Sequence, residues 1–136
     1  MAENKKIPGM GFHHINLKAT DFDKSVKFYT EVLGMTPVCS WESNGTKVQM
    51  LDVGDGGILE IGSDYKDQVP GGLWGHFALK VDDVEAAYNT AIAGGAESMT
   101  PPTVINLDSK PEKISIHISF VYGPDKEEIE FFKIVD

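Results

Sequence analysis

The sequence predicts an α+β fold built from two tandem βαβββ modules, and a repeated motif carries this prediction. The pattern His14-Ile-Asn-Leu-Lys18 returns as His76-Phe-Ala-Leu-Lys80. Each copy leads into a helix-like segment and is followed, 46 or 54 residues after its histidine, by a glutamate between apolar residues, Glu60 or Glu130. Such a duplicated unit offers two imidazoles and two carboxylates, a set suited to one divalent metal ion.

Chain length suggests how these modules are organised. A chain of 136 residues suits one compact domain or two small modules sharing a core. We expect a loose polar leader at 1–10 and a single domain at 11–136. Within it, module one spans about 11–63, a linker with Pro70-Gly-Gly72 covers 64–73, and module two spans about 74–135.

Composition narrows the class of function. Apolar residues make up 41% and charged residues 24%, which is typical of a soluble globular chain. A formal charge of −9 disfavours nucleic acid as a partner, and no apolar stretch is long enough to cross a membrane. The single cysteine, Cys39, forms no internal disulfide and fits a reducing cytoplasm. We therefore expect a cytoplasmic protein whose partner is a small molecule.

The first half reads in order as a strand, a helix and three strands. Alternation predicts a strand at 12–19. Asp21 is expected to cap a helix that Gly34 ends, because apolar residues recur between them every three or four positions. Turn signals at 43–45 and 55–57 separate the following strands, which are expected at 37–41, at 47–53 and around Glu60.

The second half repeats this order. A strand at 73–81 precedes a helix over 84–92, where Asp82 and Glu85 have the spacing of a capping box. Residues 98–113 contain three prolines and no clear period, so they are expected to form a loop that borders the cavity and influences substrate choice. Alternation then predicts the remaining strands, at 114–120 and 128–134.

Strand parity gives the repeated residues a common direction. Alternate residues of a strand face opposite sides, so His14, Asn16 and Lys18 share one face. His76 and Lys80 do the same in the second copy. Both glutamates oppose their apolar neighbours, and the apolar faces are free to pack on the helices. The four potential ligands thus point into a polar concavity.

Three other residues have plainer interpretations. His13 falls on the face opposite His14 and is expected near a strand edge or in a hydrogen bond. His117 is expected to be a polar-face residue rather than a ligand. Nothing around Cys39 suggests an activated thiolate, so we expect it in the core or at a strand end.

Three motifs together resemble the vicinal oxygen chelate superfamily, the glyoxalase/bleomycin-resistance/dioxygenase group. They are residues 12–35, the stretch Gly75-His-Phe-Ala-Leu-Lys-Val-Asp82, and residues 120–130 with Gly123-Pro-Asp125. The resemblance covers nearly the whole chain from residue 11. It implies two βαβββ modules forming a cupped mixed β-sheet around one divalent metal ion. It places the four metal ligands at His14, Glu60, His76 and Glu130. The first ligand is thus His14 and not the adjacent His13.

The ligand quartet resembles most the bacterial glyoxalase I (lactoylglutathione lyase) branch. The resemblance implies a metal-dependent lyase or isomerase acting on a 2-oxoaldehyde–thiol adduct or a related small carbonyl compound through a metal-stabilised enediolate. Glu130 is the preferred catalytic base and Glu60 the second. Mixed nitrogen and oxygen ligands suit Ni, Zn, Co, Mn or Fe(II).

The substrate side departs from that branch. Lys18 stands where glyoxalase I usually has an arginine for the glutathione carboxylate, and lysine does not grip a carboxylate in the same bidentate way. Lys18 and Asn16 are the expected substrate-binding residues. Because of this departure, the resemblance does not imply that glutathione is the thiol of the substrate.

Alternatives within the superfamily remain open. One is a bleomycin-resistance-like protein that binds a small molecule without catalysis, and others are an epimerase or a dioxygenase. The resemblance also implies a homodimer with shared metal sites, in which His14 and Glu60 come from one chain and His76 and Glu130 from the other.

Overall fold

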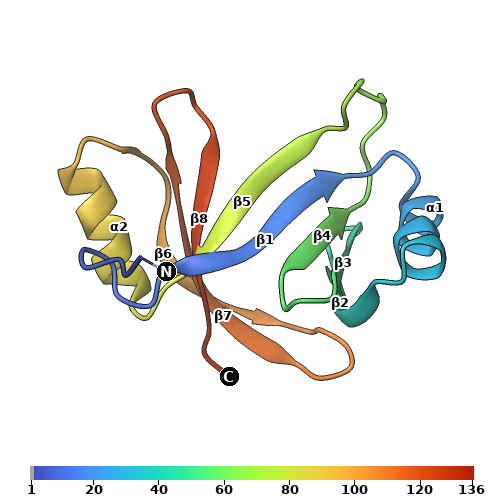
Figure 1. Ribbon diagram of the computed structural model, residues 1–136, viewed down its shortest axis with the longest axis horizontal. Coiled ribbons are helices and arrows are strands. Elements are labelled where there is room, and N and C mark those ends of the chain that lie inside the picture. Colours follow the sequence, from blue (N-terminus) through green and yellow to red (C-terminus); the bar gives the residue numbers. More distant parts are fainter. Residues whose placement is uncertain (1) are drawn as a thin grey trace. The chain divides into compact units, whose positions relative to one another are not determined.

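The computed structural model describes residues 2–136, which form two compact units (Figure 1). We name each unit after its helix. The α1 unit contains residues 14–75 and 107–113, and the α2 unit contains residues 2–13, 76–106 and 114–136. Each unit is a mixed β-sheet with one α-helical segment, as the predicted α+β class requires.

The sheet of the α1 unit has the order β2-β3-β4-β1. β1 and β4 are parallel, whereas β3 is antiparallel to both β2 and β4. The register of β1 and β4 places Asn16 opposite Glu60. The strands are β1 (Gly11–Lys18, of which residues 14–18 belong to this unit), β2 (Thr36–Ser43), β3 (Thr46–Asp52) and β4 (Ile58–Gly62).

The helical segment of the α1 unit begins at the predicted cap. Oδ1 of Asp21 accepts a hydrogen bond from the Lys24 amide at 3.1 Å, which satisfies one otherwise unpaired donor of the first turn. The α-helix α1 (Phe22–Lys27) continues as one π-helical turn, η1 (Phe28–Val32). Its apolar face packs on the sheet around four buried residues, Ala19, Leu51, Leu59 and Ile61.

The sheet of the α2 unit has the order β5-β8-β7-β6. β5 and β8 are parallel, and β7 and β8 are antiparallel. The register of β5 and β8 places Ala78 opposite Glu130. The elements are β5 (Trp74–Lys80, of which residues 76–80 belong to this unit), α2 (Val84–Ala93), β6 (Glu97–Leu107, of which residues 97–106 belong to this unit), β7 (Ile114–Tyr122) and β8 (Glu128–Ile134).

The core of the α2 unit lies between α2 and its sheet. Its buried members are Val81, Val84, Ala87, Val121 and Phe131. Ile7 and Met10 also pack on this cluster, and the Pro8 carbonyl accepts a hydrogen bond from the Asp82 amide at 3.3 Å. The polar leader thus contributes two apolar side chains to the core.

Two details of the second half correct the sequence-based expectation. The segment 98–113 is mostly the strand β6, and only 108–113 connects it to β7. Prolines are tolerated in β6 because it is the last strand of its sheet. The cap of α2 is Asp83, whose Oδ1 accepts from the Ala86 amide at 3.0 Å, rather than Asp82.

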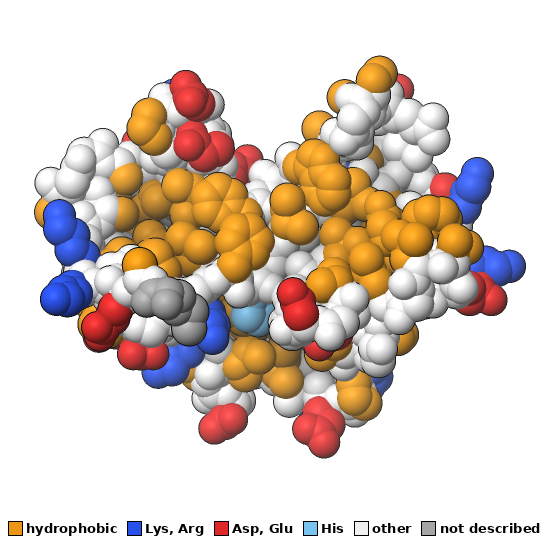
Figure 2. All heavy atoms as spheres, in the orientation of Figure 1, with side chains coloured by type: hydrophobic (Ala, Val, Ile, Leu, Met, Phe, Trp, Pro, Cys, Tyr) orange, Lys and Arg blue, Asp and Glu red, His pale blue; other side chains and the backbone are white. Residues whose placement is uncertain are grey.

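Apolar side chains also reach the surface beside each helix. Figure 2 shows hydrophobic atoms gathered over the α1 and α2 regions of the viewed face. On the α1 segment, Phe28, Val32 and Leu33 are each about half exposed or more. Among residues 2–136, every helix is too short or too polar to cross a bilayer.

Candidate metal centre

The α1 unit brings His14 and Glu60 together. Nε2 of His14 lies 3.6 Å from Oε1 of Glu60, and their side chains are 1% and 9% exposed. His14 comes from β1 and Glu60 from the parallel neighbour β4, where Leu59 and Ile61 on either side face the helix and the core. Parity therefore turns the glutamate away from the core, as predicted.

Asn16 is the second contact of Glu60. Its Nδ2 donates a hydrogen bond to Oε1 of Glu60 at 3.0 Å, and the two residues are opposite each other in the register of β1 and β4. The sequence suggested Asn16 as a substrate-binding residue. In the structure its amide nitrogen is directed to the carboxylate of Glu60.

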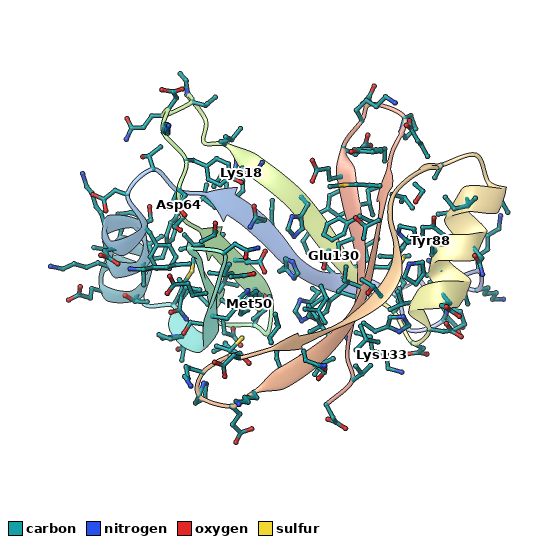
Figure 3. All side chains as sticks on the ribbon, turned by 180° about the vertical axis from the view of Figure 1, so that it is seen from behind. Lys18, Met50, Asp64, Tyr88, Glu130 and Lys133 are labelled. Carbon is teal, nitrogen blue, oxygen red and sulfur yellow. The ribbon has the colours of Figure 1, made fainter. Side chains whose placement is uncertain are left out.

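The α2 unit contains the equivalent pair, His76 and Glu130. Nε2 of His76 lies 3.2 Å from Oε1 of Glu130, and the side chains are 17% and 7% exposed. The Glu130 side chain projects from β8 (Figure 3). Phe120, which is opposite Glu130 in the register of β7 and β8, packs edge-on against the His76 ring with centroids 5.2 Å apart. This contact limits the rotation of the imidazole.

The two pairs have equivalent positions in their sheets. In the α1 unit, Asn16 is opposite Glu60, and His14 lies two residues before Asn16. In the α2 unit, Ala78 is opposite Glu130, and His76 lies two residues before Ala78. Two residues along a strand span about 6.6 Å and return to the same face. The repeat seen in the sequence is therefore a repeat of geometry.

The donor set fits a divalent metal ion. Ligand atoms that share an ion at about 2.0–2.2 Å lie roughly 3.0–3.5 Å apart, and the two nitrogen–oxygen separations, 3.6 and 3.2 Å, are close to this range. The 3.6 Å separation is too long for a hydrogen bond. Burying a carboxylate beside an imidazole is costly unless a cation or hydrogen bonds compensate it. Each unit thus offers one imidazole nitrogen and one carboxylate oxygen as candidate ligands.

Lys18 lies at the end of β1 (Figure 3). Its Nζ lies 4.8 Å from the centroid of Tyr65, within the range of a cation–π interaction. A pocket of about 440 Å³ in the α1 unit is lined by residues that include Lys18, Ser25 and Gln68. The residue expected to bind substrate is thus a partly oriented cation beside a cavity.

The other histidines have different surroundings. The His13 ring packs on Phe132 with centroids 4.2 Å apart and planes tilted by 35°, both within the α2 unit. His117 is half-buried on β7, where it is opposite Lys133 of β8. His13 and His117 therefore belong to neither of the two histidine–glutamate pairs.

Cys39 and Met50 accompany Glu60 on the sheet of the α1 unit. Met50 is opposite Glu60 in the register of β3 and β4, and Cys39 is opposite Met50 in that of β2 and β3. Burial raises the pKa of the Cys39 thiol, and the negative charge of Glu60 raises it further. The thiol therefore stays protonated near neutral pH, as expected for a residue without an activated thiolate.

Sequence reasoning missed two features of this centre, the contact of Asn16 with Glu60 and the space that Gly75 leaves beside it. The amide of Asn16 reaches Glu60 only because β1 and β4 pair in a particular register, and the two residues are 44 positions apart. Gly75 has no side chain to clash with this amide: a Cβ there would overlap Oδ1 of Asn16 and would lie 2.9 Å from Cε of Lys18. In the sequence, the only indication of this was that a glycine, Gly75, directly precedes His76 in the second motif.

The fold and the paired ligands define a class of protein, and comparison with known proteins identifies it. The model of the Glyoxalase/Bleomycin resistance protein/Dioxygenase superfamily matches residues 11–131. The chain belongs to this superfamily.

Two relatives and one solved structure illustrate the similarity. A probable lactoylglutathione lyase of Vibrio cholerae is 32% identical over 128 residues, covering 88% of each chain. A lactoylglutathione lyase of Haemophilus influenzae is 33% identical, covering 88% of this chain and 90% of the relative. The crystal structure of methylmalonyl-CoA epimerase from Mycobacterium tuberculosis superposes with a TM-score of 0.71 at 17% identity, covering 97% of this chain and 91% of that one. The last similarity is one of fold.

Proposed function

We propose that this chain is a divalent-metal-dependent lyase or isomerase of the glyoxalase I type. Its substrate would be a 2-oxoaldehyde–thiol adduct or a related small carbonyl compound. The observation that carries the proposal is the largely buried histidine–glutamate pair that occurs once in each unit at equivalent register positions. Relatives named lactoylglutathione lyase, about one-third identical over most of the chain, support the same activity.

His14, Glu60, His76 and Glu130 would together hold one ion. Two imidazoles and two carboxylates suit Ni, Zn, Co, Mn or Fe(II). When bound, such an ion supplies Lewis-acid stabilisation to the negative charge that develops on two adjacent oxygens of the substrate.

The protein's own groups move the proton. In the proposed reaction, the Glu130 carboxylate removes the proton from the carbon next to the carbonyl and returns it to the neighbouring carbon. The hydroxyl proton of the adduct passes to the former carbonyl oxygen, so one C–H and one O–H bond are broken and re-formed and the net result is an isomerisation. Glu60 is the second candidate for this role. Lys18, a cation beside a pocket, would bind an anionic group of the thiol portion.

We also propose that the active form is a homodimer. Each histidine–glutamate pair is contained in one unit, so a site can be completed by the α1 unit of one chain and the α2 unit of its partner. The half-exposed apolar side chains of the α1 segment supply surface that a partner can bury.

The activity test uses purified protein loaded with each candidate metal and a panel of hemithioacetals. We expect turnover and the appearance of a thioester, with Glu130→Gln losing turnover while the protein remains folded. A protein that binds the adducts without metal and without turnover would instead be a sequestering protein. His13→Ala is the matched control, because its ring packs on Phe132 rather than on a glutamate.

A further inference from the structure

We propose that Asn16 is a positioning residue that anchors Glu60 as the fixed carboxylate of the metal centre. The carboxylate oxygen that lies 3.6 Å from Nε2 of His14 is also the one that accepts the hydrogen bond from Nδ2 of Asn16 at 3.0 Å. Both contacts fix the same atom, Oε1 of Glu60. The inference rests on the proposed function, because it assigns a role within the proposed metal site.

Two glycines, Gly62 and Gly75, leave space for the amide on either side. Asn16 is opposite Glu60 in the parallel pairing of β1 with β4, so its side chain leaves the sheet on the same face as the carboxylate. On one side, a Cβ on Gly62 would meet Nδ2 of Asn16 at 3.8 Å, an ordinary contact. On the other, a Cβ on Gly75 would overlap Oδ1 and would lie 3.2 Å from Cγ of Asn16. The amide thus has room for this orientation only because residue 75 is a glycine.

The second half of the chain provides an internal comparison. Ala78 is opposite Glu130 in the parallel pairing of β5 with β8, so it occupies the position that Asn16 has opposite Glu60. A methyl group cannot donate a hydrogen bond, so the restraint that Asn16 applies to Glu60 has no counterpart at Ala78. The hydrogen bond from Asn16 is therefore specific to the Glu60 half of the repeat.

Residues that hydrogen-bond to a metal ligand affect affinity without touching the metal. Losing one typically weakens binding by about 10–100-fold, because the ligand must then be ordered by the metal itself. Asn16→Leu keeps the size of the side chain and removes the donor. Gly75→Ala leaves Asn16 in place and displaces its amide. Both changes are expected to weaken metal binding by about the same factor.

Two variants control for nonspecific effects. Gly62→Ala places a methyl group beside the same amide at an ordinary contact distance, so it is expected to leave the metal affinity unchanged. Asn89→Leu makes the same chemical change at an exposed position of α2. The thermal midpoint of each metal-free variant reports whether it is folded.

The experiment titrates Co²⁺ into the metal-free proteins and records both affinity and the visible absorption spectrum. The wild type should bind one Co²⁺ per chain. Asn16→Leu and Gly75→Ala should bind about 10–100-fold more weakly with an altered spectrum, because a mobile Glu60 changes the coordination. If Asn16→Leu does not fold, Gly75→Ala decides. Wild-type affinity and spectrum in the folded variants would overturn the role of Asn16 alone, whereas no Co²⁺ binding by the wild type would overturn the proposed function itself.

Discussion

Nε2 of His76 lies 3.2 Å from Oε1 of Glu130, although the residue opposite Glu130 in the sheet is Ala78. The histidine reaches the carboxylate diagonally, from two residues earlier on the neighbouring strand. His14 and Glu60 are related in the same way. A pair of parallel strands thus brings one histidine and one glutamate together, and the chain contains this arrangement twice.

Replacing one ligand should remove most of the metal affinity. We expect His14→Ala, His76→Ala, Glu60→Ala and Glu130→Ala each to weaken binding by more than about 100-fold, beyond the 10–100-fold typical of outer residues. Equilibrium dialysis against a competing chelator measures this. His13→Ala should retain wild-type affinity. Loss of the metal in His13→Ala with retention in His14→Ala would reverse the assignment of the two adjacent histidines.

Strand parity was the part of this centre that the sequence could predict. It placed His14 and Glu60 on the face opposite Leu59, and the structure confirms that face, because side-chain direction depends only on local alternation. The hydrogen bond from Asn16 to Glu60 was not predicted, because it depends on the register between strands far apart in the chain.

The strand β6 was missed for a different reason. Pro101 and Pro102 lie within it, and proline is normally a signal against a strand. A strand at the end of a sheet has one side without a pairing neighbour in that sheet, and there a missing N–H costs little. The segment can be a strand because it lies at the end of the sheet. The local sequence contains no information about this position.

Shared sites between two chains predict complementation. When His14→Ala and His76→Ala proteins are mixed, unfolded and refolded together, each heterodimer should contain one site with all four ligands. Turnover should therefore recover to about one-quarter of the wild-type value, because half of the dimers are mixed and each holds one of two sites. Sites built within one chain would give no recovery. Each variant refolded alone is the control.

The thiol of Cys39 should report the charge of Glu60. Burial raises its pKa above the ordinary 9.0, and the Glu60 carboxylate raises it further by disfavouring the thiolate. In metal-free protein, Glu60→Gln removes the second cause, so the pKa should fall and alkylation by iodoacetamide should begin at lower pH. Mass spectrometry across a pH series measures the rate. An unchanged pH profile would mean that the two side chains are not close.

The connection between β6 and β7 is expected to influence substrate binding. Lys110 and Ser40 exchange backbone hydrogen bonds of 2.8 and 2.9 Å, and Asp108, Lys110 and Trp41 help to line a pocket of about 400 Å³. Replacing 108–113 by a tight Asn-Gly turn should raise KM several-fold and leave metal content intact. Lys113→Ala, a change at a mostly exposed side chain, is the control. A loss of metal would contradict this role.

The core of the α1 unit should be sensitive to cavities. Ile61 is fully buried between the strands and the α1 segment, so Ile61→Ala should lower the free energy of unfolding by about 2–5 kcal/mol. Val53→Ala, at a position that is 45% exposed and lies outside the α1 segment, should change it by less than about 0.5 kcal/mol. Urea titration followed by circular dichroism compares them. A similar loss in both variants would contradict the assignment of Ile61 to the core.

Metal content tests the central claim most directly. Protein purified from rich medium, or reloaded after chelation, should contain one divalent ion per chain by inductively coupled plasma mass spectrometry, whether the sites lie within one chain or between two. The Glu60→Ala, Glu130→Ala double variant should contain almost none. A wild-type protein without stoichiometric metal, or a double variant that keeps it, would contradict a centre built from the two histidine–glutamate pairs.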